Sequence, residues 1–364
     1  MPIPNMKKTM LEVYQQDVND VRPGLLASLF KSKESYNVDS ERVAIDIVKN
    51  SKKIAPVVTA LGGASVKVSK SVFNGIEVAA PIYSLKSVVD LYELMQRQPG
   101  ETEWTKDKIN WAVKVANKLR NYKSEMTNMI VRSLELQAAQ VLQTGTITLT
   151  DENGNDAYTL NLGKSSNQMV SPVNKWDTSG SDPEKDLDAL AQVLADEAGI
   201  TATTLIFGRK AWDAFMKHEK IANLIHKDSY DMGTFTNEIR DRGEIYKGRI
   251  SLGSFNFYLY CYNTCYEEFD SKSLVRYLDE KNVLMLPNES DLDFRLIQTV
   301  YPMLKSKSEF SNLVPDEAII NKIKFYNKIW DDEDAEATYL KVAARPMCLP
   351  VSLDNWGVLT NVCS

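Results

Sequence analysis

The longest periodic pattern in the chain is that of one amphipathic helix. Apolar or small residues recur at steps of three and four at Ala112, Val115, Leu119, Tyr122, Met126, Ile130, Leu134, Ala138 and Val141. This spacing predicts a helix from about Thr105 to Thr144. Gly145 follows at once and suits the position after a helix end, where the backbone turns left-handed. At 1.5 Å per residue the helix is roughly 60 Å long, which favours an elongated molecule over a compact globule.

Alternating apolar and polar positions predict a β-hairpin on each side of this helix. The first is "GGASVKVSKSVFNGIEVAAPIYSL" (62–85), centred on Asn74-Gly75, a dipeptide that suits a type I′ turn with positive φ. Because this hairpin has little apolar mass of its own, another element must cover it. The second is "TITLTDENGNDAYTLNLG" (146–163), centred on Asn153-Gly154. The earlier stretch "SERVAIDIVKNSKKIAP" also alternates and predicts a strand within an irregular arm.

The second half of the chain reads as a mixed α/β unit. Asp182 is suited to cap a helix that has Pro183 in its first position and Gly199 after its end. Its predicted buried face consists of Leu187, Leu190, Ala191 and Leu194. A strand at 203–207 and a helix with Ala211, Trp212 and Phe215 follow, and we expect Trp212 and Phe215 in the core. Further strands are predicted in "GSFNFYLYCYNTCY", "NVLMLP" and "LDFRLIQTVY", and the two prolines of "ARPMCLP" predict an edge or bent strand.

Composition narrows the function classes. The chain has 364 residues, of which 43% are apolar and 25% charged, as in folded proteins. A net charge of −6 gives no basic footprint for tight binding of nucleic acid. The sequence has no signal-peptide pattern and no run of 18 apolar residues, so we expect neither secretion by a signal peptide nor a membrane span. The cysteines are too few and scattered for a disulfide framework, which predicts free thiols in a reducing cytoplasm: Cys261, Cys265, Cys348 and Cys363.

One segment has the outline of a ligand-binding loop. "TTLIFGRKAW" (203–212) combines a short apolar strand, Gly208 and the start of a helix, as phosphate-binding loops do. It has a single glycine and matches neither G-x-G-x-x-G nor G-x-x-x-x-G-K-[ST]. A tight strand-to-helix turn is therefore the favoured interpretation. A cytoplasmic α/β enzyme that uses this loop remains an alternative function.

The other chemical candidates are weaker. His218 and His226 lie eight residues apart, whereas the zinc motif H-E-x-x-H needs four, and no third ligand is in view. Cys261 and Cys265 have no second Cys or His pair at zinc-finger spacing, which favours strand packing. The acidic run at 331–336 lacks the glycine of a calcium loop and reads as a solvated surface. The sequence therefore predicts no catalytic, cofactor-binding or metal site.

The order of several landmarks is characteristic of one family. They are "VAIDIVKNSKKIAPVV", "AAPIYSLKSVVD", the turn "RQPGE", the helix exit "AAQVLQTGTITL", the domain entry "GSDPEKDL", "TTLIFGRKAWDAF", "FYLYCYN" and "ARPMCLP". In this order and spacing, from about Leu11 to Val362, the chain resembles the major capsid proteins of tailed phages in the lambda major head protein (capsid protein E) family. These are built on the Hong Kong 97-type fold.

The resemblance implies an α+β fold with five parts. They are an N-terminal arm (1–60), an extended β-hairpin loop (61–100), a peripheral domain with a long spine helix (101–182), an axial α/β domain (183–330) and C-terminal strands that complete the peripheral domain (331–364). It also implies site residues. At the subunit interface of the extended loop these are Phe73, Asn74, Gly75, Pro81 and Tyr83, with Pro81 and Tyr83 anchoring the loop to a neighbour. The structural turns are Gly100, Gly145 and Gly208.

The function implied by the resemblance is assembly without catalysis or cofactor. Copies would form the pentamers and hexamers of the icosahedral head shell of a tailed double-stranded DNA phage, assembled in the cytoplasm of the host bacterium and located in the virion capsid. Portal, scaffolding and decoration proteins would be its partners. A net-negative wall suits a shell that encloses DNA without gripping it. A nanocompartment shell of the same fold, which encloses an enzyme cargo in place of a genome, is a further alternative.

Overall fold

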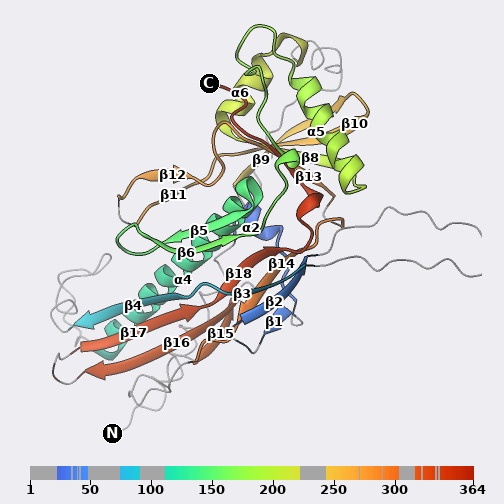
Figure 1. Ribbon diagram of the computed structural model, residues 1–364. Coiled ribbons are helices and arrows are strands. Elements are labelled where there is room, and N and C mark those ends of the chain that lie inside the picture. Colours follow the sequence, from blue (N-terminus) through green and yellow to red (C-terminus); the bar gives the residue numbers. More distant parts are fainter. Residues whose placement is uncertain are drawn as a thin grey trace, which may run out of the picture.

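The protein is an elongated α+β molecule (Figure 1). The computed structural model describes residues 23–33, 36–38, 40, 42–47, 74–90, 111–221, 243–269, 271–288, 290–302, 316–320, 323–332, 334 and 337–364. A six-stranded sheet with two covering helices occupies one end, and a long helix with smaller sheets beside it occupies the other.

Helix α4 (Trp111–Thr144) is the spine of the molecule (Figure 1). Its 34 residues give a length of about 50 Å. The predicted end is confirmed, because Gly145 has φ 67° and donates its N–H to the carbonyl of Val141 at 2.9 Å. The predicted start near Thr105 lies outside the described residues. The predicted apolar face is buried over most of its length, with Leu119, Ile130 and Leu134 each 1% exposed.

Three small sheets lie along α4. The first is four-stranded, in the order β15 (Glu317–Ile320), β16 (Ile323–Asp332), β17 (Ala337–Ala344) and β4 (Tyr83–Asp90). The second contains β1 (Asn37–Val38), β14 (Phe294–Thr299) and β18 (Pro346–Pro350). The third is the predicted hairpin of β5 (Thr146–Thr150) and β6 (Asp156–Asn161), which turns at Gly154 with φ 79°.

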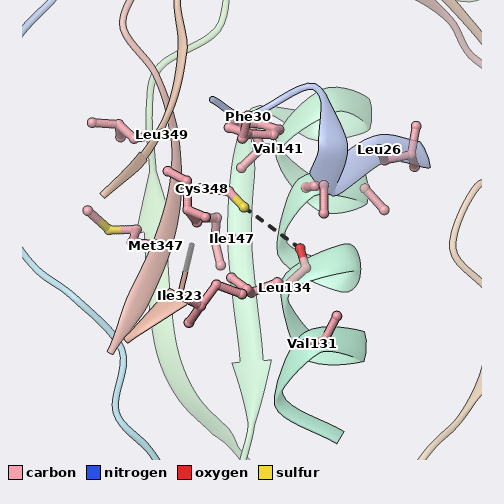
Figure 2. Close-up of a cluster of buried hydrophobic side chains, with 14 of the residues drawn as sticks. Leu26, Phe30, Val131, Leu134, Val141, Ile147, Ile323, Met347, Cys348 and Leu349 are labelled. Carbon is pink, nitrogen blue, oxygen red and sulfur yellow. Dashed lines mark hydrogen bonds between the residues drawn. The ribbon is translucent and has the colours of Figure 1, made fainter. Parts of the chain in front are cut away.

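Strand β18 confirms the prediction from its two prolines, since it lies at the edge of its sheet. Cys348 points from β18 towards α4, whereas Met347 and Leu349 point to the other side of the strand (Figure 2). Cys348 is fully buried there, with its Sγ 3.8 Å from the carbonyl oxygen of Leu134. The short helix α2 (Leu25–Ser28) closes one side of the same cluster through Leu26, and Phe30 follows it.

The six-stranded sheet is covered on both faces. Its order is β7 (Met169–Val170), β19 (Gly357–Leu359), β13 (Val283–Pro287), β8 (Ala202–Phe207), β10 (Phe255–Tyr262) and β9 (Glu244–Leu252). Successive side chains of a strand point to opposite faces. Leu205 and Phe207 accordingly pack with helices α5 (Pro183–Glu197) and α6 (Arg209–Lys217), whereas Ile206 packs into the cluster around α4. The sheet is therefore common to both hydrophobic cores.

The local predictions for α5 and α6 agree with the structure, except that Trp212, expected in the core, is only half-buried. Asp182 accepts a hydrogen bond from the N–H of Lys185, Pro183 occupies the first turn, and the predicted apolar face of α5 is buried. Gly199 has φ 72°, as expected beyond a helix end. Phe215 is fully buried as predicted. Trp212 lies at the rim, half-buried, with its ring 5.4 Å from that of Phe207 in an edge-on arrangement.

The predicted turn at Asn74-Gly75 is wrong. Both residues belong to β3 (Asn74–Ala79), which pairs antiparallel with β2 (Arg42–Ile47) in the register Asn74–Ile47 and Gly75–Asp46. Strand β2 is the one expected in the N-terminal arm, so the arm and the loop share one ribbon. An Asn-Gly pair can also lie within a strand. Here the pairing with β2, which is distant in the sequence, makes these two residues part of a strand and not of a turn. Residues 48–73 lie outside the described part.

The two hydrophobic cores divide the chain differently from the predicted domains. Phe294, Leu296 and Phe325 fall within 183–330, yet they are buried in the cluster around α4. Conversely, Leu359 and Val362 return to the cluster around α5 and α6. The strand with which a segment pairs decides in which core its side chains are buried. Segments from both sides of residue 330 therefore contribute to each core.

Candidate functional site

The loop after β8 is filled by the protein's own backbone. Gly208 donates its N–H to the carbonyl of Asn282 at 2.9 Å, and Ala211 donates to that of Glu280 at 2.8 Å. A Cβ at position 208 would lie 2.2 Å from the carbonyl oxygen of Asp279. The predicted tight turn at Gly208 is confirmed. Because these carbonyls occupy the place of an anion at the start of α6, the loop is not an open phosphate cradle.

The other chemical candidates are dispersed. His218 lies with its Nε2 3.1 Å from the carbonyl oxygen of Ser181, and His226 lies outside the described residues. Cys261 is buried within β10, and Cys265 is exposed at the start of β11 (Cys265–Glu267). Within the described ranges, no three His, Cys, Asp or Glu side chains group in a way that could hold a metal ion. Among the helices described there, none is long and apolar enough to span a membrane.

Glu135 forms a junction between three parts of the chain. This α4 side chain is 3% exposed, and its carboxylate accepts hydrogen bonds from the N–H groups of Leu26 and Ala27 at 2.9 and 2.8 Å and from the hydroxyl of Tyr262 at 2.7 Å. It thereby joins α2, α4 and the six-stranded sheet. A side chain at Gly24 would collide with this carboxylate. Burial raises the pKa of Glu135, although the three donors act in the opposite direction.

A cavity of about 200 Å³ lies between α2 and the six-stranded sheet. Leu25 and Leu29 line it on one side, and Tyr260 and Leu286 line it on the other. Glu244 also faces it, is 4% exposed, and has no hydrogen-bond partner for its Oε2 in the described part of the chain.

Tyr83 is held by its own chain. Its hydroxyl accepts a hydrogen bond from Nε2 of Gln137 at 2.6 Å, while Oε1 of Gln137 accepts from the N–H of Cys348 at 3.1 Å. Burial raises the pKa of Tyr83 above its usual range. Pro81 is buried beside it, and Arg345 donates to the carbonyl of Ala80 at 3.2 Å. Tyr83 therefore fixes β4 to the spine, and the contact of Pro81 and Tyr83 with a neighbouring subunit stays a prediction.

Gly145 faces a buried lysine. Nζ of Lys164 donates to the carbonyl of Trp356 at 2.7 Å and to that of Leu353 at 3.2 Å, and it lies 3.4 Å from the centre of the Trp356 ring. Burial lowers the pKa of Lys164 well below its usual value. A Cβ at Gly145 would lie 2.5 Å from that of Lys164. The predicted turn residue Gly100 and the predicted loop residue Phe73 lie outside the described residues.

Comparison with known proteins identifies the family. The model of the family described as phage major capsid protein E matches residues 8–356. The chain belongs to this family. No curated protein sequence matches it. The predicted resemblance is confirmed, and the chain is a shell-forming capsid protein.

One of the similar solved structures shares the architecture of this chain at a TM-score above 0.5. A proposed capsid protein of a prophage from E. coli CFT073 is 15% identical, with 98% of each chain covered and a TM-score of 0.59. A phage-related protein from Bordetella bronchiseptica RB50 is 14% identical over 98% of this chain and 97% of its own, with a TM-score of 0.48. A virus-like particle protein from Pyrococcus furiosus is 11% identical over 98% of both chains, with a TM-score of 0.41. The α+β Hong Kong 97-type capsid fold is confirmed.

The sequence did not point to the junction at Glu135. A glutamate on a helix ordinarily faces solvent. The available signal was that α4 carries apolar residues on almost every side between Ile130 and Leu142, so polar residues in that stretch need internal partners.

Proposed function

We propose that this chain is the major capsid protein of a tailed double-stranded DNA phage and that its copies form the pentamers and hexamers of an icosahedral head shell. The observation that carries the proposal is the family match over nearly the whole chain. The protein would act by assembly and not by catalysis. It would assemble in the cytoplasm of the host bacterium and reside in the virion capsid.

Each part of the fold receives a role in this proposal. The six-stranded sheet with α5 and α6 would be the axial domain, which meets its copies around five-fold and six-fold axes. Helix α4 and the sheets along it would be the peripheral domain. The ribbon of β2 and β3 would begin the extended loop, so we place the start of that loop at Arg42. Identical copies that meet through heterologous contacts close into rings, and rings can tile a shell.

The partners follow from the same role. The shell would enclose double-stranded DNA without sequence-specific binding, which suits a subunit of net charge −6. Portal, scaffolding and decoration proteins would contact it. The acidic balance limits attraction between the wall and the phosphate backbone during packaging.

Size-exclusion chromatography and negative-stain microscopy of the purified protein test the proposal. We expect megadalton particles with closed shells. Protein that stays monomeric or dimeric under all assembly conditions would contradict a shell. Particles that enclose an enzyme cargo and no nucleic acid when isolated from their natural host would favour the nanocompartment alternative.

A ribbon variant tests the extended-loop assignment separately. Ile47 and Asn74 are paired at the end of the described ribbon, so an Asn-Gly linker can replace residues 48–73. Val43 and Val78 stay buried and hold the ribbon to the core. We expect a variant with unchanged far-UV circular dichroism and melting temperature that forms no closed shells. Normal shells from this variant would refute the assignment while leaving the capsid role intact.

A further inference from the structure

The outer face of the four-stranded sheet is chemically ordered in rows. One face of this sheet is buried against α4, and Leu340 and Val342 belong to the hydrophobic cluster around that helix. Residues directly opposite one another on antiparallel strands point to the same face, so the register defines rows across β16, β17 and β4. On the outer face these rows are basic, aromatic and acidic in succession.

The basic row consists of Lys328, Lys341 and Lys86, paired directly opposite one another. Lys86 is exposed and the other two are half-buried. Lys341 bonds to the hydroxyl of Tyr301, and no carboxylate in the described ranges pairs with Lys86 or Lys328. Like charges placed directly opposite in a sheet destabilise it. The repulsion within this row therefore destabilises an isolated subunit, and an acidic partner would relieve it.

The next row is apolar and partly open to solvent. It consists of Trp330, Tyr339 and Val88. The rings of Trp330 and Tyr339 stack at 5.3 Å with an interplanar angle of 16°, and Val88 is 40% exposed. Nζ of Lys86 lies 3.9 Å from the centre of the Tyr339 ring, which holds its ammonium group close to this row. Aromatic rings supported in this way offer a flat contact surface.

The third row lies at the end of the sheet, where Ala337 is paired with Asp332 on one side and Asp90 on the other. The basic and acidic rows are each two residues from the aromatic row along the strands, or about 7 Å. A two-fold axis parallel to the aromatic row, lying just above it, would place the outer face of a second copy onto the outer face of the first. In that arrangement Lys328 meets the position of Asp332 in the second copy.

We propose that this face is an isologous contact between two copies of the chain. The aromatic rows pack on each other along the two-fold axis, and Lys328 of each copy faces Asp332 of the other. The proposal rests on the assembly function proposed above and adds to it a surface and a symmetry. A self-complementary face of this kind is what a two-fold contact requires, and its charge pattern sets the register of the two sheets.

A charge-swap cycle tests the contact. Lys328→Asp places two like-charged pairs in each contact, so the protein concentration needed for shell formation should rise about tenfold or more. Asp332→Lys should have a similar effect. The double variant Lys328→Asp/Asp332→Lys restores both pairs with the wild-type net charge and should restore assembly. The matched control is Lys185→Glu, an exposed lysine of α5, which should assemble normally.

Cysteine cross-linking tests the two-fold symmetry of the contact independently of the charge-swap variants. A residue on a two-fold axis meets its own copy, so Val88→Cys should give covalent dimers with a bismaleimide that spans about 8 Å, since stacked sheets lie about 10 Å apart. Both cysteine variants also carry Cys265→Ser, because the exposed thiol of Cys265 would itself react with the bismaleimide. Val173→Cys, at a position 98% exposed elsewhere, measures non-specific cross-linking.

The outcomes separate the alternatives. Restoration by the double variant together with dimers specific to Val88→Cys supports the proposal. Normal assembly by Lys328→Asp, failure of the double variant to recover, or equal cross-linking at Val88 and Val173 overturns it. Loss of heparin or DNA binding with assembly unchanged also overturns it, in favour of a polyanion site. Wild-type protein that forms no particles contradicts the proposed function, whereas normal particles from Lys328→Asp overturn this inference alone.

Discussion

Glycine-to-alanine substitution at two positions separates the two reasons why a chain needs glycine. Gly208 has φ −70°, which any residue adopts, but a Cβ there would lie 2.2 and 2.7 Å from the carbonyl oxygens of Asp279 and Glu280. Gly163 has φ 75°, and a Cβ at that position would have no atom within 4 Å. The first substitution is therefore a steric problem and the second a conformational one.

The magnitudes follow from these geometries. Gly163→Ala should lower the free energy of unfolding by about 1 kcal/mol, the cost of a left-handed alanine. Gly208→Ala must displace backbone, which weakens two hydrogen bonds made by Gly208 and Ala211 at about 1 kcal/mol each and adds packing strain. We expect a total of about 2 to 4 kcal/mol for that variant.

Urea unfolding of the unassembled protein, followed by tryptophan fluorescence, measures both values. Equal slopes of the unfolding transition would show that the unfolded states are comparable. If Gly208→Ala costs no more than Gly163→Ala, the carbonyls of residues 279–282 do not crowd the turn. That result would refute a loop after β8 that is filled by backbone.

Three further substitutions test other contacts. Asp182→Ala should lower the free energy of unfolding by about 1 kcal/mol through loss of the α5 cap, measured by urea unfolding with Asp182→Asn as the conservative control. Tyr83→Phe should cost about 1 to 2 kcal/mol, because Gln137 is left buried with an unpaired donor; no loss of melting temperature would contradict that. Burial raises the pKa of Glu135, with Glu244 adding to the effect and Tyr262 opposing it, so the folded chain keeps a proton that the unfolded chain releases. The wild-type protein should therefore gain stability relative to Glu135→Gln as the pH falls from neutral towards 4.5. A difference in the free energy of unfolding that does not change with pH would contradict a raised pKa of Glu135.

Local features of the fold could be predicted from the sequence because neighbouring residues determine them. The end of α4 at Gly145, the cap at Asp182 and the turn at Gly154 each depend on a few adjacent side chains and a permitted backbone geometry. The edge position of β18 followed in the same way from its two prolines.

The features that were wrong or missed depend on partners distant in the sequence. Asn74-Gly75 is a strand because residues 42–47 pair with it, and no local signal distinguishes that pairing from a turn. The strands of 294–332 belong with α4 because of where their side chains are buried. Glu135 acquires its role from Leu26 and Tyr262, which lie far from it along the chain.

The placement of β19 has a consequence for synthesis. This strand comes from the last residues of the chain but lies inside the six-stranded sheet, between β7 and β13. Similarly, β4 near the start of the chain pairs with β17 near its end. A nascent chain on the ribosome cannot complete the sheet of β4 before β17 has been synthesised, nor the six-stranded sheet before β19 has been synthesised, although most domains fold as they emerge. A product truncated before β17 thus lacks both finished sheets.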